Sequence, residues 1–471
     1  MDKFDLIIIG GGGAGLAAAH TALENGVKRI ALLEALKKTG GNSAMAGGFI
    51  YALDTPQLRS SGLNDATHEL KAALDFHHYD YVNPALIRRW LNETKNTIAW
   101  LESRGHEFIL SHLGEGYTHV MADSPGVSWF HHVLRPLTAE LETRGVRFFY
   151  QATATEILKR DGKVCGVKAE APDGILELEA NAVLLACGGF MADREQLKAR
   201  FPQYYSPESF YQIVPSRANG VELAASAGAR LNGECTLVKE AGMCFIPGPG
   251  RPGRIFGAQG SVFVNRLGRR YVDESLWNQN YSANGMLHQK DMAGYAIYSR
   301  ETLEHVMSLE APFDFKSERD AFMSYMAKAS EKGEECRFAD TLAELARWIG
   351  CPAEALEKTV SDYNGYCRAG LDLEFVKPAD CLIPLESGPY LAVRIKPMYI
   401  DTIGPVVIDE SMRVLDLDWS PIPGFYAAGV IAAGWEGRDY MRFGSALSFS
   451  VTSGRMAGAS IAADLKQAVL L

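Results

Sequence analysis

The sequence predicts an α/β fold in which alternating strands and helices are interrupted by an inserted domain. The first observation is an apolar run at residues 4–9, which leads directly into a glycine segment, 10–15, and an alanine-rich helical stretch. The second is a change of character at 233–385, where glycine, proline and aromatic residues precede two helical stretches. A Rossmann-like nucleotide-binding domain, split by an α+β capping domain, accounts for this order.

The N-terminal segment contains each part that binding of a dinucleotide requires. Glycines let the backbone turn tightly and approach a pyrophosphate, and the helix that follows offers free N–H groups and a positive dipole end. Gly15 lets this helix lie close to the strand. A second apolar run, 29–33, ends in Glu34, whose carboxylate can accept hydrogen bonds from an adenosine ribose. Because strand, turn, helix and acid agree in spacing, we expect a bound dinucleotide rather than a glycine turn without a ligand.

Hydrophobic patterning and turn residues predict the remaining elements. Helices are expected at 64–76, 85–104, 130–144, 221–228, 316–330, 340–367 and 445–465. Strands are expected at 146–150, 156–159, 164–169, 181–186 and 421–426. We expect the nucleotide-binding domain to comprise residues 1–232 and 386–471, and the capping domain to comprise residues 233–385.

Composition and charge exclude several classes of function. The formal net charge of −10 disfavours binding to nucleic acid, and no apolar run approaches the roughly 20 residues of a membrane-spanning helix. The eight cysteines are isolated and the eleven histidines lack metal-ligand spacing, so we expect no metal site, haem or iron–sulfur cluster. The first strand begins within a few residues of the start, so we expect a cytoplasmic protein without a signal peptide.

Further segments carry a resemblance to a known family. They read Gly40-Gly41-Asn42-Ser43-Ala44-Met45-Ala46-Gly47-Gly48, Ala186-Cys187-Gly188-Gly189-Phe190, Asn219-Gly220, and Gly429 followed by Gly444-Ser445-Ala446-Leu447. Together with the N-terminus they resemble the FAD-binding segments of the fumarate reductase and succinate dehydrogenase flavoprotein family. That family includes 3-ketosteroid dehydrogenases, urocanate reductase and tricarballylate dehydrogenase. Residues 264–274 and 395–409 extend the resemblance over nearly the whole chain.

The resemblance implies that FAD is the cofactor. Members with a covalent flavin carry a histidine in the second glycine segment, and residues 40–48 contain none, so we expect non-covalent FAD. Asn42 and Ser43 are expected near the polar edge of the isoalloxazine ring. The full set of expected FAD-binding residues is Gly10, Gly12, Gly13, Ala14, Gly15, Glu34, Gly40, Gly41, Asn42, Ser43, Gly47, Gly48, Ala154, Ala186, Gly188, Gly189, Asn219, Gly220, Gly429, Ser445, Ala446 and Leu447.

The resemblance also implies hydride transfer between flavin N5 and a C=C or CH–CH bond next to a carbonyl or carboxylate of a small-molecule substrate. Arg442 falls where the family's fumarate reductases have an arginine that holds a substrate carboxylate. A planar guanidinium suits a carboxylate or an enolate oxygen. Contact with the FAD phosphates, or a structural ion pair, is the alternative for Arg442.

Two positions depart from the family pattern. The proton-donating arginine of the fumarate reductases is replaced by Asn278, and a carboxylate-binding histidine is replaced by Asp401, before Thr402. We therefore expect a substrate other than fumarate or succinate, such as a bulky or cyclic, steroid-like enone. Tyr399, Asp401 and Tyr440 are the candidates for handling the proton, although each could equally serve the fold.

Asn278, Thr402, Trp129 and His132 are expected on the substrate side. Two alternatives remain open: oxidation of a C–N bond in an amine or amino acid, with Asp401 facing an ammonium, and a flavin-binding subunit without turnover. The sequence contains no second glycine fingerprint for NAD(P)H, so the electron donor or acceptor is a separate, unidentified partner.

Overall fold

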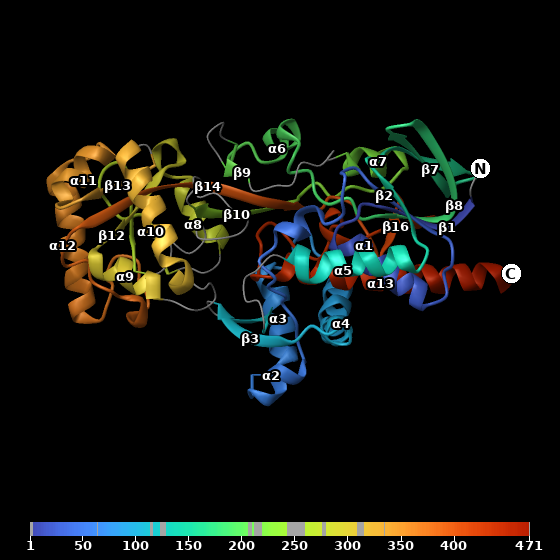
Figure 1. Cartoon of the computed structure of the whole chain (residues 1–471), viewed down its shortest axis with the longest axis horizontal. Helices are drawn as coiled ribbons and strands as arrows, with labels where there is room; N and C mark the ends of the chain where they lie inside the picture. Colours follow the sequence, from blue (N-terminus) through green and yellow to red (C-terminus); the bar gives the residue numbers. More distant parts are fainter. Residues whose placement is uncertain are drawn as a thin grey trace.

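The computed structural model describes residues 3–63, 65–113, 116–122, 129–205, 210–211, 219–242, 260–275, 279–308, 315–333 and 335–470. Within these ranges the chain forms two lobes, and one long strand, β14 (Tyr390–Ile403), runs from the outer lobe toward the centre of the molecule (Figure 1). Both lobes combine helices with a sheet, which confirms the predicted α/β class.

The first lobe is built on an eight-stranded sheet. Its strands follow the spatial order β15-β16-β8-β1-β2-β5, and β7 pairs with both β8 and β6. Strand β1 lies parallel to β2 and β8, and its apolar run is buried because both faces of the sheet are covered. The strands are β1 (Lys3–Ile9), β2 (Ile30–Glu34), β5 (Arg147–Tyr150), β6 (Thr153–Arg160), β7 (Lys163–Ala171), β8 (Gly174–Leu185), β15 (Arg413–Leu415) and β16 (Pro421–Ala427).

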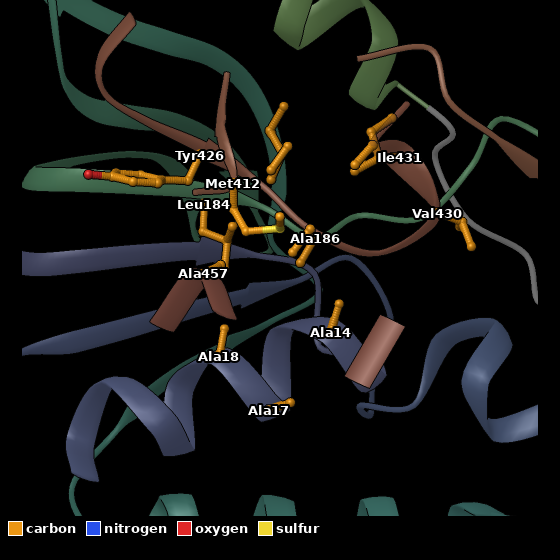
Figure 2. Close-up of a cluster of buried hydrophobic side chains, with 14 of the residues drawn as sticks. Ala14, Ala17, Ala18, Leu184, Ala186, Met412, Tyr426, Val430, Ile431 and Ala457 are labelled. Carbon is orange, nitrogen blue, oxygen red and sulfur yellow. The ribbon is translucent and has the colours of Figure 1, made fainter. Parts of the chain in front are cut away.

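Small residues bring two helices, α1 (Gly13–Glu24) and α13 (Ser445–Leu470), into close contact beside this sheet. A Cβ added at Gly454 would lie 2.2 Å from the Ala14 carbonyl oxygen, so a side chain there would push the helices apart. Figure 2 shows Ala14 and Ala18 of α1 within the same buried cluster as Ala457 of α13. The N-terminal ends of both helices are thereby fixed relative to the ends of the parallel strands.

The second sheet has six strands and extends through the outer lobe. Strand β14 pairs antiparallel with β12 and β13 along its first half and with β10 along its second half. Two further clusters of buried apolar side chains lie in the outer lobe, on β11, β12, β14 and the helices around them. The strands are β9 (Phe210–Tyr211), β10 (Thr236–Gly242), β11 (Val262–Val264), β12 (Gly294–Tyr298), β13 (Cys336–Ala339) and β14.

The remaining elements surround these two sheets. A separate hairpin joins β3 (Phe108–Leu113) to β4 (Gly116–Met121), and β3 lies beside α2, α3 and α4 in Figure 1. The other helices are α2 (Pro56–Ser60), α3 (Ala66–Phe76), α4 (Pro84–Glu102), α5 (Arg135–Thr143), α6 (Arg194–Arg200), α7 (Gly220–Ser226), α8 (Gln279–Met286), α9 (Arg300–Ser308), α10 (Phe315–Lys332), α11 (Leu342–Ile349) and α12 (Ala353–Ala369). Among the described helices, none is long and apolar enough to cross a membrane.

One predicted element is wrong. The helical stretch expected at 340–367 is two helices, because α11 ends at Gly350 and α12 begins after Pro352. Gly350 adopts φ of +80°, a left-handed conformation that ends a helix, and proline cannot continue one. The strand expected at 181–186 is the end of the longer β8, which begins seven residues earlier, at Gly174. The other predicted helices and strands exist within a few residues of their expected bounds. The expected domain boundaries near 232 and 385 stay predictions.

Candidate functional site

A cavity that is partly open to solvent lies where several parallel strands of the first sheet end. Its wall includes Gly10 after β1, Glu34 at the end of β2, Ala186 after β8 and Gly429 after β16. The carboxyl ends of parallel strands are the usual ligand-binding edge of such a sheet. The first part of this wall is therefore placed to receive a nucleotide.

The glycine turn keeps this wall free of side chains. Gly10 has φ of +108°, and a Cβ on Gly15 would lie 2.0 Å from the Gly10 carbonyl oxygen, so neither position accepts a larger residue without movement. Gly12 differs, because a Cβ there would have no described protein atom nearer than 3.8 Å, and Gly12 lines the cavity. The space in front of the first turn of α1 is thus bounded by backbone, as a pyrophosphate requires.

Glu34 connects the end of β2 to the glycine turn. Its carboxylate accepts hydrogen bonds from the backbone N–H of Gly11 (2.9 Å) and Leu36 (2.8 Å). Burial raises the pKa of this carboxyl, and the backbone hydrogen bonds act in the opposite direction. A carboxylate has about four acceptor positions, so Glu34 can still accept from ribose hydroxyls. On the neighbouring wall the Asn219 side-chain amide donates to the Ala154 carbonyl oxygen at 2.7 Å.

The opposite end of the cavity is formed by side chains from β10, β14, the loop before α13 and the segment that follows Gly48. Val238, Ile400, Phe49 and Phe443 supply apolar surface, and the rings of Phe49 and Phe443 meet edge to face with their centroids 4.8 Å apart. Asp401 lies among them as a carboxyl group. This end combines an apolar wall with one acid.

Asp401 is the titratable group placed at this end. Its Oδ1 accepts from the Thr402 N–H at 2.9 Å, and its carboxylate also accepts from the Asn42 side chain. Burial raises the pKa of Asp401 to about 6, while these two hydrogen bonds favour the ionised form. A carboxyl group with a pKa near 6 can both hold and release a proton close to neutral pH.

The loop before α13 is held by a buried cluster of polar groups. His77 Nε2 lies 3.2 Å from Glu436 Oε2, and His77 Nδ1 accepts from the Gly437 N–H at 3.2 Å. The Glu436 carboxylate also accepts from the Met441 N–H and from the Ser445 hydroxyl. This cluster fixes the chain on both sides of the residues that reach the cavity from this loop.

Tyr440 and Arg442 lie within this loop. Tyr440 lines the cavity, and its hydroxyl oxygen accepts from the Ala446 N–H at 2.8 Å, which caps the first turn of α13. The Arg442 Nη2 donates to Glu69 Oε2 at 3.2 Å, and Tyr51 donates to the same oxygen at 2.7 Å. Burial and the nearby Glu69 raise the pKa of Tyr51 well above its usual value, so Tyr51 stays protonated.

A family model described as an FAD binding domain matches residues 5–440 of the chain. The chain belongs to this FAD-binding family. FAD is therefore its cofactor. The glycine turn, Glu34 and the start of α1 fit the nucleotide part of that cofactor. The predicted resemblance to the fumarate reductase and succinate dehydrogenase flavoproteins is confirmed by the relatives that follow.

The chain is 26% identical over 496 residues to a vinyl phenol reductase of Lactiplantibacillus plantarum, covering 97% of this chain and 96% of that protein. It is 26% identical over 463 residues to a fumarate reductase (cytochrome) of Shewanella frigidimarina, with coverage of 97% and 76%. It is 29% identical over 493 residues to a urocanate reductase of Eggerthella lenta, with coverage of 98% and 74%. These relatives establish an FAD-dependent oxidoreductase.

Two solved structures show the same fold. A 3-ketosteroid delta1-dehydrogenase from Sterolibacterium denitrificans superposes with a TM-score of 0.78 at 18% identity, covering 98% of this chain and 100% of that one. The open conformation of a flavocytochrome c3 fumarate reductase superposes with a TM-score of 0.76 at 23% identity, covering 98% and 79%.

Most of the expected FAD-binding residues line the cavity. Those that do not are Gly15, Gly40, Gly48, Gly220 and Ser445, which lie behind the wall. For two of them the reason is close packing: a Cβ on Gly15 or Gly220 would meet protein atoms within about 2.4 Å. Their expected contact with FAD stays a prediction.

The expected substrate-side residues are placed differently from one another. Asp401 and Tyr440 line the cavity, whereas Tyr399, Thr402, Trp129, His132 and Arg442 do not. The Tyr399 hydroxyl donates to the Tyr204 carbonyl oxygen, and the Thr402 hydroxyl accepts from the Phe190 N–H at 2.8 Å. Trp129 is fully buried. Asn278 lies outside the described residues, so its expected role stays a prediction.

Sequence patterns did not indicate two residues that line this end of the cavity, Val238 and Phe49, or two that contact the loop before α13, His77 and Glu69. Val238 comes opposite Asp401 through the pairing of β10 with β14, a register that no local pattern specifies. Phe49, His77 and Glu69 come from the N-terminal part of the chain and meet the loop before α13 only in the folded protein. For Phe443 a signal was available, because it follows Arg442 directly.

Proposed function

We propose that this protein transfers hydride between non-covalently bound FAD and a C=C or CH–CH bond that is activated by a neighbouring electron-withdrawing group. The relatives are reductases named for vinyl phenol, fumarate and urocanate, which supports a reaction at an alkene. None of the described cavity residues is a histidine, which supports a non-covalent flavin. Bound FAD would supply or accept the hydride at its N5 atom.

The main observation behind this proposal is the position of Asp401 on the cavity wall. An alkene that accepts a hydride on one carbon needs a proton on the other, and reversal of the reaction needs a base at the same place. Asp401 is a carboxyl group on the cavity wall with a pKa of about 6, held in position by Asn42 and the Thr402 N–H. It can therefore donate a proton during reduction or accept one during dehydrogenation.

Tyr440 is the second candidate for handling the proton. Its hydroxyl oxygen accepts from the Ala446 N–H, which holds this tyrosine against the start of α13 and beside the cavity. Phe49 and Phe443 provide an apolar wall beside it, which suits the unsaturated part of a bulky or cyclic substrate. Tyr399 remains a weaker candidate, because its hydroxyl is committed to the Tyr204 carbonyl oxygen.

The outer lobe fits the role of a cap. Strand β14 carries Asp401 near its end and pairs with outer-lobe strands along its first half, so a substrate bound between the lobes would touch both. Closure of such a cap excludes water and protects reduced flavin from side reactions. The residues expected to form it are 233–385, with FAD held by 1–232 and 386–471.

The test is reoxidation of reduced holoenzyme. Flavin is photoreduced without oxygen and mixed with enones, vinyl phenols, fumarate or urocanate, and the return of oxidised-flavin absorbance is followed. We expect alkenes to reoxidise the wild type, and the D401N variant to do so at least about 100-fold more slowly. Oxygen consumption with amines or amino acids, together with no reaction with any alkene, would instead support C–N oxidation. Flavin that reacts with neither class would support a subunit without turnover.

A further inference from the structure

We propose that Glu69 determines the substrate class of this site: by pairing with Arg442 it removes the cation from anion binding, so that the site selects neutral alkenes over carboxylates. This rests on the proposed alkene chemistry. The cation concerned lies in the loop between Tyr440 and Phe443, both of which line the cavity. The segment therefore places Arg442 one residue from the wall.

The contact geometry shows that Arg442 already has an anionic partner. Its Nη2 lies 3.2 Å from Glu69 Oε2, and the side chains of both residues are largely buried, at 22% and 27% exposure. Tyr51 donates to the same carboxylate oxygen at 2.7 Å and is itself buried. Glu69 is thus held in place from two sides. A guanidinium paired in this way offers hydrogen bonds but little net positive charge.

The charges of the cavity wall also favour a neutral substrate. Among the described wall residues there is no lysine, arginine or histidine, and the two acids are Glu34 and Asp401. Lys239, next to the wall residue Val238, is buried and has its Nζ 3.2 Å from Asp439 Oδ1. Arg442 and Lys239, two cations near Asp401, are therefore each paired with an acid. Among the described wall residues, a substrate carboxylate would meet Asp401 and no cation.

The apolar side chains provide what a neutral substrate needs. Phe49, Phe443, Val238 and Ile400 offer surface for burial, and Tyr440 lines the same part of the cavity. The substrate class that fits is a neutral, conjugated alkene with an aromatic or cyclic body. An anionic alkenoate has a similar volume, but its negative charge would lie close to that of Asp401.

The test compares cinnamamide with cinnamate, which have nearly the same shape but differ in charge. In wild-type holoenzyme we expect cinnamamide to bind at least about tenfold more tightly, read from the perturbation of oxidised-flavin absorbance. In E69Q we expect the KM for cinnamate to fall about fivefold with kcat little changed, and the KM for cinnamamide to stay within about twofold. The gained cinnamate affinity should weaken as salt is added.

Three controls separate charge from structure. E69D keeps the negative charge and should keep the wild-type preference, while E170Q removes the charge of an exposed side chain on β7 and should change neither KM. Y51F removes the second hydrogen bond to Glu69 but leaves the ion pair, so its preference should stay near that of the wild type. An equal loss of preference in E69D and E69Q would show a structural role and overturn the inference.

Failure of the two proposals can be told apart. If wild-type enzyme binds or reduces cinnamate as well as cinnamamide, Glu69 does not set the substrate class, although alkene reduction stands. If neither compound nor any other alkene reoxidises reduced flavin, the proposed function fails. The binding measurement on oxidised holoenzyme still decides the charge preference in that case.

Discussion

The two ends of the FAD cavity are built from different parts of the polypeptide. The nucleotide end consists of backbone at strand ends and at the start of α1, where Gly10 and Gly12 leave room for the ligand. The opposite end consists of side chains, including Asp401, Tyr440 and Phe443, brought together from separate segments. A wall of backbone offers the same groups whatever its side chains are, whereas a wall of side chains changes with each substitution.

The largest expected effect lies at the nucleotide end. Substitution of one glycine there is expected to impair folding, and substitution of another is expected to impair only FAD binding. In G15A the new Cβ would lie 2.0 Å from the Gly10 carbonyl oxygen, so we expect a loss of about 3 kcal/mol in stability and loss of FAD. In G12A no described protein atom lies nearer than 3.8 Å to the new Cβ, so the protein should stay folded but bind FAD weakly. Urea unfolding measures the stability of each variant, and the flavin content of the purified protein measures its FAD binding. Normal FAD content in G12A would show that this turn does not face the cofactor.

The next effect lies at the opposite end and concerns the pH dependence of turnover. If Asp401 donates the proton during alkene reduction, kcat should fall as pH rises through about 6, because the carboxyl loses its proton. In the dehydrogenation direction kcat should rise through the same pH. D401N should abolish this inflection and lower kcat at least about 100-fold. D173N, at an exposed hairpin turn, is the matched control, and an unchanged profile in D401N would remove Asp401 from the reaction.

A smaller effect is expected from the loop that carries Tyr440. H77A removes a buried partner of Glu436 and the acceptor of the Gly437 N–H, so stability should fall by about 3 kcal/mol. The affinity for FAD should fall as well, because the same loop leads into α13. H68A, which alters an exposed histidine of α3, should leave both properties near the wild-type values. Unchanged FAD affinity in a destabilised H77A would show that the loop and the cofactor are independent.

The smallest effect tests whether Thr402 contacts substrate or supports the fold. Its buried hydroxyl accepts from the Phe190 N–H, so T402V should cost about 1 to 2 kcal/mol in stability and leave KM for the best alkene unchanged. T402S keeps the hydroxyl and should retain most of the stability. A raised KM in T402V with normal stability would instead place Thr402 at the substrate.

The contrast between the two ends also explains what the sequence could predict. The strand, glycine turn, helix and acid of the nucleotide end are contiguous, so local spacing was enough to expect them, and β1, α1 and β2 were found where expected. The opposite end depends on pairs such as Arg442 with Glu69, which lie 373 residues apart in sequence. Such pairs follow from packing of the whole chain, and no local pattern indicates them.

Strand β14 has a mechanical consequence. It is 14 residues long, which corresponds to about 46 Å of continuous extended backbone, and it is hydrogen-bonded in the outer lobe at one end and to β10 beside the cavity at the other. A rotation of the outer lobe must therefore bend or twist this strand, or carry its end along. Because Asp401 lies near that end, the stiffness of one strand couples the enclosure of a substrate to the alignment of the acid that would protonate it.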